Sequence, residues 1–144
     1  MAKRKKGRRR ASRKNKEIVE IDKFKRYQTQ LRVHHLYPAK KDGFCDCGCG
    51  QELSGRQKRW ASTKCTNKVV KEFKIIKGDT KVIREEIQKR DKDVCAECNE
   101  PADVWQADHI IEVRHGGGGC TLDNFQTLCT VCHKKKTKEN YNKK

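Results

Sequence analysis

Apolar positions recur at three- and four-residue steps in the first part of the chain, a spacing that predicts amphipathic helices. The pattern predicts helices over residues 17–36, 63–76 and 80–91. In the first helix the recurring positions are Phe24, Tyr27, Leu31 and His34 or His35. Pro38 ends this run because proline cannot continue a helix.

The second and third predicted helices have recognisable capping residues. Ser62 or Thr63 can cap the second helix, and Gly78 can end it. Asp79 can cap the third helix with its side-chain carboxylate. The apolar faces consist of Val69, Val70, Phe73 and Ile76 in the second helix and of Ile83 and Ile87 in the third.

The pattern then changes and predicts a strand, a loop and a helix. A strand region covers 104–113, and the glycines at 116–119 form a flexible loop. A short extended piece follows at 120–122, and a lysine-rich final helix begins at His133. The apolar residues expected to start a turn or helix between them are Leu122, Phe125 and Leu128.

The composition argues against a large packed core. Of the 144 residues, 33% are hydrophobic and 38% are charged. Chains of this kind favour small modules that bound metal holds together. Together with the predicted elements, this indicates a small α+β protein stabilised by bound metal.

The charge indicates a phosphate-binding protein. The formal net charge is +17, and the pI is near 9.7. A protein that binds RNA generally, for example on the ribosome, fits the charge equally well. Residues 1–16 contain Lys and Arg but no acid, so we expect a basic tail that is disordered when free. This tail, with Arg8, Arg9 and Arg10, is expected to contact phosphates; a nuclear targeting signal or a solvated tail are the alternatives.

The sequence contains neither a long apolar run nor an apolar region behind its basic start, so we expect no membrane span and no secretory signal. The expected location is the cytoplasm or nucleoid in a bacterial or phage context, or the nucleus in a eukaryote. In such a compartment the nine cysteines are expected to be reduced and to bind metal.

Two Cys-x-x-Cys pairs, Cys95 with Cys98 and Cys129 with Cys132, are the strongest signal in the chain. Each pair can present two thiolates to one ion, and four thiolates suit a closed tetrahedral zinc site. A redox role for either pair is the alternative, but no thioredoxin-like pattern surrounds them.

A second group of cysteines lies upstream. Gly48 and Gly50 allow the sharp turns that a metal-binding knuckle needs. The group predicts a second structural zinc, although some of its thiols could instead be free. Arg56, beside the group, would face solvent or phosphate. The four cysteines are Cys45, Cys47, Cys49 and Cys65.

Polar residues of a second kind lie between and beside the C-terminal cysteine pairs: Asp108, His109, Asn124 and His133. A carboxylate and an imidazole can bind a catalytic divalent ion, and a neutral histidine can activate water. Because Asp108 and His109 are adjacent, both can serve one reaction only if the backbone bends at this point.

The segments ADHIIEVRHGGGG and LDNFQTLCTVCHKKKT resemble the zinc-containing HNH endonucleases, which have the ββα-metal fold. They are similar to the HNH domains of eukaryotic annealing helicases of the zinc-finger Ran-binding type and of small bacterial and phage proteins. The resemblance covers roughly residues 80–140. It implies an HNH nuclease domain over 79–144. The residues before it indicate a helical segment with the second zinc knuckle over 17–78.

The resemblance also implies a role for each motif residue. His109 would be the general base, and Asn124 would support its loop. Asp108 and His133 would bind the catalytic ion, Mg²⁺ or another divalent ion. The structural zinc ligands would be Cys95, Cys98, Cys129 and Cys132. The final helix would lie near the minor groove and the phosphates, with contacts from Lys134, Lys135 and Lys136.

These observations predict a metal-dependent HNH endonuclease that nicks or cuts double-stranded or structured DNA. One alternative is a zinc protein that binds nucleic acid without cutting it. Another is a nuclease subunit of a larger DNA-processing complex. Protein partners, oligomeric state and target preference are left open by the sequence.

Overall fold

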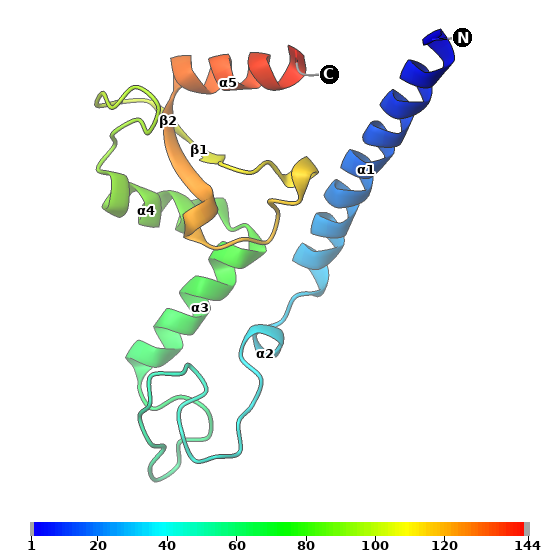
Figure 1. Cartoon of the computed structure of the whole chain (residues 1–144). Helices are drawn as coiled ribbons and strands as arrows, with labels where there is room; N and C mark the ends of the chain where they lie inside the picture. The colour runs from blue at the N-terminus through cyan, green and yellow to red at the C-terminus, as the bar shows by residue number, and fades with distance from the viewer. Residues whose placement is uncertain (1, 143–144) are drawn as a thin grey trace.

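The computed structural model describes residues 2–142, with side chains from residue 16 onward. Five α-helices and a two-stranded sheet make up this described part (Figure 1). The helices are α1 (Ala2–Gln30), α2 (Val33–Leu36), α3 (Thr63–Lys77), α4 (Thr80–Asp91) and α5 (Thr130–Asn142). The strands are β1 (Trp105–His109) and β2 (Phe125–Cys129), with the short 3-10 helices η1 (Val113–His115) and η2 (Leu122–Asn124) between them. No helix among the described residues is long and apolar enough to cross a membrane.

The first helix differs from the expectation at both ends. Helix α1 begins at Ala2, ahead of the predicted start at residue 17, because Lys, Arg and Ala all favour helix and no proline interrupts them. Disorder of the basic tail in the free protein stays a prediction. The helix ends at Gln30, and α2 follows as a separate turn. The side chains of Arg8, Arg9 and Arg10 lie outside the described residues.

Helices α3 and α4 confirm the predicted spans to within one residue. The Ser62 side chain accepts a hydrogen bond from the Cys65 amide and caps α3, while Gly78 ends it at a φ of 86°. The Asp79 carboxylate accepts from the Val82 amide and caps α4. Gly78 and Asp79 are all that separates these two helices, so the turn between them is tight.

The sheet corrects the expected position of the second strand. Strands β1 and β2 pair antiparallel, with Trp105 opposite Cys129 and His109 opposite Phe125. Leu122, the last residue of the extended piece expected at 120–122, begins η2 (Leu122–Asn124) instead. Residues 125–129, where a turn or helix was expected to start, are extended. The periodicity missed β2 because one of its fully buried positions is the polar Thr127, whose hydroxyl donates to Asp91 at 2.8 Å.

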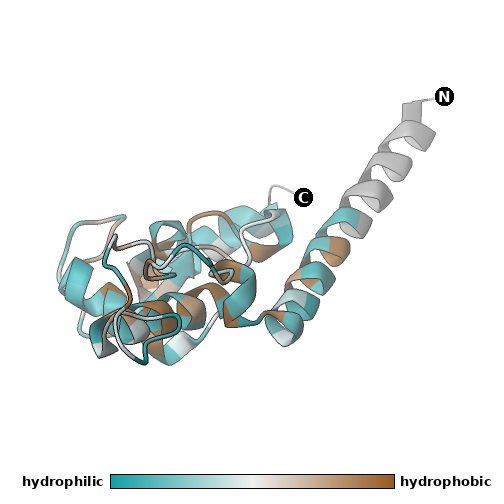
Figure 2. Cartoon of the chain, turned by 90° about the horizontal axis from the view of Figure 1, so that it is seen from below, coloured by the Kyte–Doolittle hydropathy of each residue, from teal (hydrophilic) through white to brown (hydrophobic). Residues whose placement is uncertain are grey.

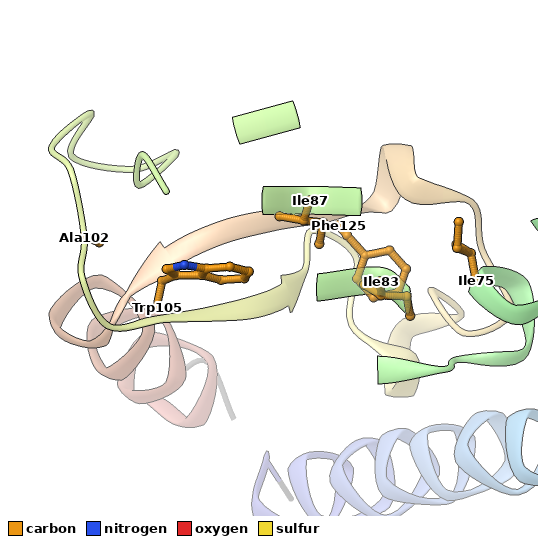
Figure 3. Close-up of a cluster of buried hydrophobic side chains, with 6 residues drawn as sticks. All are labelled: Ile75, Ile83, Ile87, Ala102, Trp105 and Phe125. Atoms are coloured by element: carbon orange, nitrogen blue, oxygen red, sulfur yellow. The ribbon is translucent and has the colours of Figure 1, made fainter. Parts of the chain in front are cut away.

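The main core lies between α4 and the sheet. Ile83 and Ile87 of α4 face Trp105 and Phe125 of the sheet (Figure 3). Ile75 of α3 completes one end of this cluster. A separate cluster surrounds the upstream cysteines and includes Val69. Apolar stretches are short and interleaved with hydrophilic ones along the ribbon (Figure 2). Both cores are therefore small, as the composition predicted.

Helix α5 follows β2 without a linker and contacts both strands. The order β1, β2, α5 is the ββα unit that the sequence predicted, and the fold class is α+β. Helix α1 lies beside η1, in the connection between the strands (Figure 1). Helix α3 joins the ββα unit to the upstream cysteine module at its far end (Figure 1).

Candidate functional site

The C-terminal cysteines converge from separate elements. Cys95 and Cys98 lie in the turn after α4, Cys129 ends β2, and Cys132 is in the first turn of α5. Their four Sγ atoms all lie within 4.8 Å of one another. The amide of Ala96 donates to the Thr127 carbonyl at 2.8 Å and fixes the first turn to β2.

This cluster fits a tetrahedral metal ion. A zinc–sulfur bond of about 2.3 Å implies sulfurs roughly 3.8 Å apart, close to the observed grouping. Burial opposes ionisation of Cys95, but hydrogen bonds from the amides of Cys129, Cys98 and Glu97 lower the pKa of its thiol to about 6. The pKa of Cys132 is raised to about 12, chiefly through its hydrogen bond with Cys129. Cys95 therefore ionises more readily than Cys132, and a bound cation would favour the thiolate form of both.

The upstream cysteines form a second cluster with the same geometry. The Sγ atoms of Cys45, Cys47, Cys49 and Cys65 lie within 4.8 Å of one another. Gly48 and Gly50 turn the chain between them with φ values of 79° and 78°, which glycine adopts without strain. Cys65 enters from the first turn of α3. Each of the two clusters therefore brings together four donors that could hold one metal ion.

An ion pair closes the upstream module. The Asp46 side chain is 1% exposed and accepts from Arg59 Nε at 2.7 Å. The Lys40 amide donates to the other carboxylate oxygen at 2.8 Å. Burial acts to raise the pKa of Asp46, but Arg59 and the Lys40 amide outweigh it and leave that pKa lowered. The pair therefore stays charged and joins the two sides of the module.

Asp108 of β1 and His133 of α5 lie together on the face of the sheet that α5 covers. His133 Nε2 is 3.8 Å from Asp108 Oδ1. Gln126, opposite Asp108 in the sheet, donates to Asp108 Oδ2 at 3.1 Å. The Lys136 ammonium also contacts Asp108 Oδ2 and donates to the His109 carbonyl at 2.5 Å. A carboxylate and an imidazole are thus side by side, with a cation already against the carboxylate.

His109 is the last residue of β1, and its ring packs on Phe125 with the ring centroids 4.3 Å apart. The ring borders a cavity of about 330 Å³ between α1, α4 and the sheet, which Phe24 and Ile83 also line. Burial lowers the pKa of His109, so the imidazole is neutral near pH 7. The chain bends at Ile110, one residue beyond the predicted bend at Asp108-His109. Asp108 and His109 are therefore consecutive residues of β1, and their side chains point to opposite faces of the sheet.

Asn124 connects the two parts of the loop between the strands. Its carbonyl accepts from the Ile111 amide at 2.8 Å. Its amide donates to the carbonyls of Ile111 at 3.0 Å and Gly117 at 3.1 Å. Gly117 is required here because an added Cβ would lie 1.7 Å from the Ile111 oxygen. The predicted support of the His109 loop by Asn124 is consistent with these contacts.

The lysines of α5 divide into two groups. Lys134 and Lys135 are exposed, whereas Lys136 is half-buried against Asp108. The sequence predicted Lys136 only as a phosphate contact and did not predict its place beside Asp108. The signal was present, since His133 and Lys136 are three residues apart and share a helix face. Arg56 is exposed beside the upstream module.

Two further contacts were not expected from the sequence. Helix α1 packs closely on the glycine loop, since a Cβ on Gly118 would lie 2.6 Å from the Phe24 ring. Likewise, a Cβ on Gly119 would lie 2.7 Å from the Tyr27 ring.

Cys120, which has no place in either cysteine cluster, is half-buried and packs against the main core.

Comparison with known proteins gives a match to one domain. The family model described as HNH endonuclease matches residues 95–139. A stretch of 33 residues, 23% of this chain, is 70% identical to the "DNA annealing helicase and endonuclease ZRANB3" of Mus musculus and to that of Homo sapiens. The protein of the same name from Bos taurus is 67% identical over 33 residues. The matched stretch covers 3% of each of these relatives. No solved structure matches.

Proposed function

We propose that the protein is a metal-dependent DNA endonuclease that hydrolyses phosphodiester bonds, in line with the match of residues 95–139 to the HNH endonuclease family. The observation that carries this proposal is the pairing of Asp108 with His133 beside the thiolate cluster. Cys132 and His133 are consecutive, so a metal in the cluster fixes the helix turn that presents the imidazole. A divalent ion on Asp108 and His133 would neutralise charge on the phosphate and on the leaving 3′ oxygen.

His109 acts as the general base in this proposal, which requires its ring to turn from Phe125 toward the water at the ion held by Asp108 and His133. Its lowered pKa keeps the ring neutral, so it can accept a proton from the attacking water. Attack at phosphorus and loss of the 3′ oxygen leave a 5′-phosphate and a 3′-hydroxyl. The hydrogen bonds of Asn124 hold the segment that follows His109, which limits movement of the base.

Lys136 has two positions in the proposed reaction. Its ammonium lies against Asp108 in the structure and there stands in for part of the charge of a divalent ion. Binding of Mg²⁺ requires the ammonium to leave the carboxylate. From the same helix turn the side chain can then reach a phosphate of the substrate.

In this proposal the zinc ions have a structural role and the magnesium ion a catalytic one. Zinc in the cluster of Cys95, Cys98, Cys129 and Cys132 is structural, because a site closed by four thiolates leaves no position for substrate. Zinc in the upstream cluster holds the module at the start of α3 in the same way. Mg²⁺ or a similar ion at Asp108 and His133 keeps open positions for water and phosphate.

A non-catalytic DNA-binding protein is the second candidate, and the net charge of +17 favours it as well. A third is a nuclease subunit of a larger DNA-processing complex, in line with relatives whose name joins an annealing helicase to an endonuclease. The expected location follows the DNA: the nucleus in a eukaryote, or the nucleoid in a bacterial or phage context.

Metal titration on several DNA forms separates these candidates. Zinc-loaded protein is incubated with supercoiled plasmid, single strands and branched DNA while Mg²⁺ or Mn²⁺ is varied. The endonuclease proposal expects nicks that depend on the added ion and that DNA ligase reseals. If no DNA form is cut at any concentration of either ion, the protein only binds, or it needs partners.

A further inference from the structure

The upstream cysteine module carries an open hollow of about 650 Å³ on its surface. We call it the knuckle hollow. The residues that matter for its chemistry are Arg56, Lys58, Arg59, Trp60, Ser62 and Thr66. These are three cations, an indole and two hydroxyls, and no carboxylate is among the described residues that line the hollow. Its lining therefore offers donors to an anion.

The floor of the knuckle hollow is held in place by the module itself. Arg59 stacks 4.7 Å from the centroid of the Trp60 ring and pairs with the buried Asp46. Trp60 in turn meets Tyr37 edge-on, with the ring centroids 6.1 Å apart. Arg59 is thus committed to the structure, and its charge is balanced by Asp46.

Arg56 and Lys58 are different, because both are exposed at the edge of the hollow. Across the described part of the chain, neither has an ion pair or a hydrogen bond from its side chain. The Ser62 and Thr66 hydroxyls already donate to Cys65 Sγ and to the Ser62 carbonyl, so the free donors are the two cations. Two unpaired cations suit successive phosphates of a nucleic-acid backbone, which side chains of these types commonly contact. They offer no fixed arrangement for reading base edges.

Helix α3 sets the distance between this surface and the nuclease domain. The hollow lies at the start of α3, and Gly78 at its end borders the cavity beside His109. The 15 residues of α3 span about 22 Å at 1.5 Å per residue. That length corresponds to roughly six to seven base pairs at 3.4 Å each. A single DNA duplex is therefore long enough to contact both the knuckle hollow and the nuclease domain.

We propose that the knuckle hollow binds the sugar–phosphate backbone of the DNA that the HNH domain cuts, about six to seven base pairs or more from the cut. Arg56 and Lys58 contact two phosphates, and α3 acts as a rigid spacer. This inference rests on the proposed function for the identity of the nucleic acid. A metal ion in the upstream cluster would then contribute to DNA binding, because it would stabilise the fold of the module that forms the knuckle hollow.

Binding by a non-cutting chain tests this inference separately from catalysis. The full zinc-loaded chain carrying His109→Ala is titrated into a labelled 20-base-pair duplex between about 50 and 200 mM salt. The double variant Arg56→Gln/Lys58→Gln is compared with Lys68→Gln/Lys89→Gln. The control removes the same charge from exposed lysines outside the hollow. Equal zinc content and circular dichroism show that both variants fold.

The hollow variant is expected to bind at least about tenfold more weakly near 0.1 M salt. Its plot of log affinity against log salt should be shallower by about 1.8, because each lost phosphate contact removes about 0.9. The control should keep the parent slope. The inference is overturned if hollow and control variants have the same slope, or if duplex RNA shows the change and DNA does not. A chain that binds in this way but never cuts refutes the proposed function and leaves the hollow intact.

Discussion

His109 is the residue whose protonation should set the acid limit of cutting. Burial lowers its pKa from the usual 6.5, so the neutral form persists to lower pH than for a solvent-exposed histidine. A general base must be neutral to accept a proton, and the rate should therefore fall only below pH 6.5. Nicking rates between pH 5 and 8 at saturating Mg²⁺ measure this midpoint. An acid midpoint above 6.5 would mean that another group limits the rate.

Lys136 should weaken binding of the catalytic ion, because its ammonium must leave Asp108 first. Lys136→Met keeps the length of the stem and removes the charge. The affinity for Mn²⁺ should rise by about tenfold, since hydrogen bonds to charged groups contribute roughly 1.5–3 kcal/mol. Calorimetry on zinc-loaded protein measures the dissociation constant without any need for cutting.

The matched control is Lys138→Met, an exposed lysine on the same helix. It should leave the Mn²⁺ affinity unchanged. Equal affinities for all three proteins would show that the contact between Lys136 and Asp108 does not compete with the ion.

The loop between the strands should tolerate no side chain at Gly117. An added Cβ would lie 1.7 Å from the Ile111 carbonyl oxygen, and this backbone cannot move without breaking the hydrogen bonds of Asn124. Gly117→Ala should lower the free energy of unfolding by about 2 kcal/mol or more, as overpacking does elsewhere. Thermal denaturation of zinc-loaded protein measures the effect.

Comparing Gly118→Ala with Gly117→Ala separates the packing of α1 on the loop from the packing within the loop. A Cβ at Gly118 would meet the Phe24 ring of α1 instead of loop backbone. The Gly118→Ala variant should loosen α1 from the loop, seen as faster amide exchange in residues 16–30, and leave the exchange of β1 and β2 unchanged. Identical exchange in the two glycine variants would contradict this division between loop and helix.

The elements that the sequence predicted well carry their own local signals. Ser62, Gly78 and Asp79 mark the ends of α3 and α4 through caps that depend on near neighbours alone. Strand β2 has no such signal, because Thr127 is buried by a partner 36 positions earlier in the chain. Its extended form depends on pairing with β1, which a local pattern cannot show.

The candidate site shows the same division. The grouping of the cysteines follows from their spacing, and the structure brings both sets of four together. The place of Lys136 against Asp108 depends on how α5 crosses the sheet. The packing of α1 on Gly118 likewise depends on tertiary contacts, as does the cavity beside His109. The type of each side chain suggested its role. Its position in the structure depends on contacts with residues distant in the sequence, which a local pattern does not show.

For the whole molecule, the account predicts that cutting depends on a metal that does no chemistry. Cys98→Ser should remove the C-terminal zinc and abolish nicking, because α5 then no longer presents His133 beside Asp108. Cys49→Ser, in the upstream cluster, should reduce DNA affinity and leave nicking at saturating DNA. Zinc content by mass spectrometry accompanies both assays. Nicking that survives verified loss of the C-terminal zinc would show that the two metal sites are not coupled.

The central claim is that this chain hydrolyses DNA with His109 as its base. The most direct measurement is the single-turnover nicking rate of His109→Ala against wild type, at equal zinc content, saturating Mg²⁺ and equal DNA occupancy. The control is His34→Ala, an exposed histidine on α2. The account predicts a loss of about 10²-fold or more for His109→Ala and none for the control. Nicking by His109→Ala at the wild-type rate would contradict it.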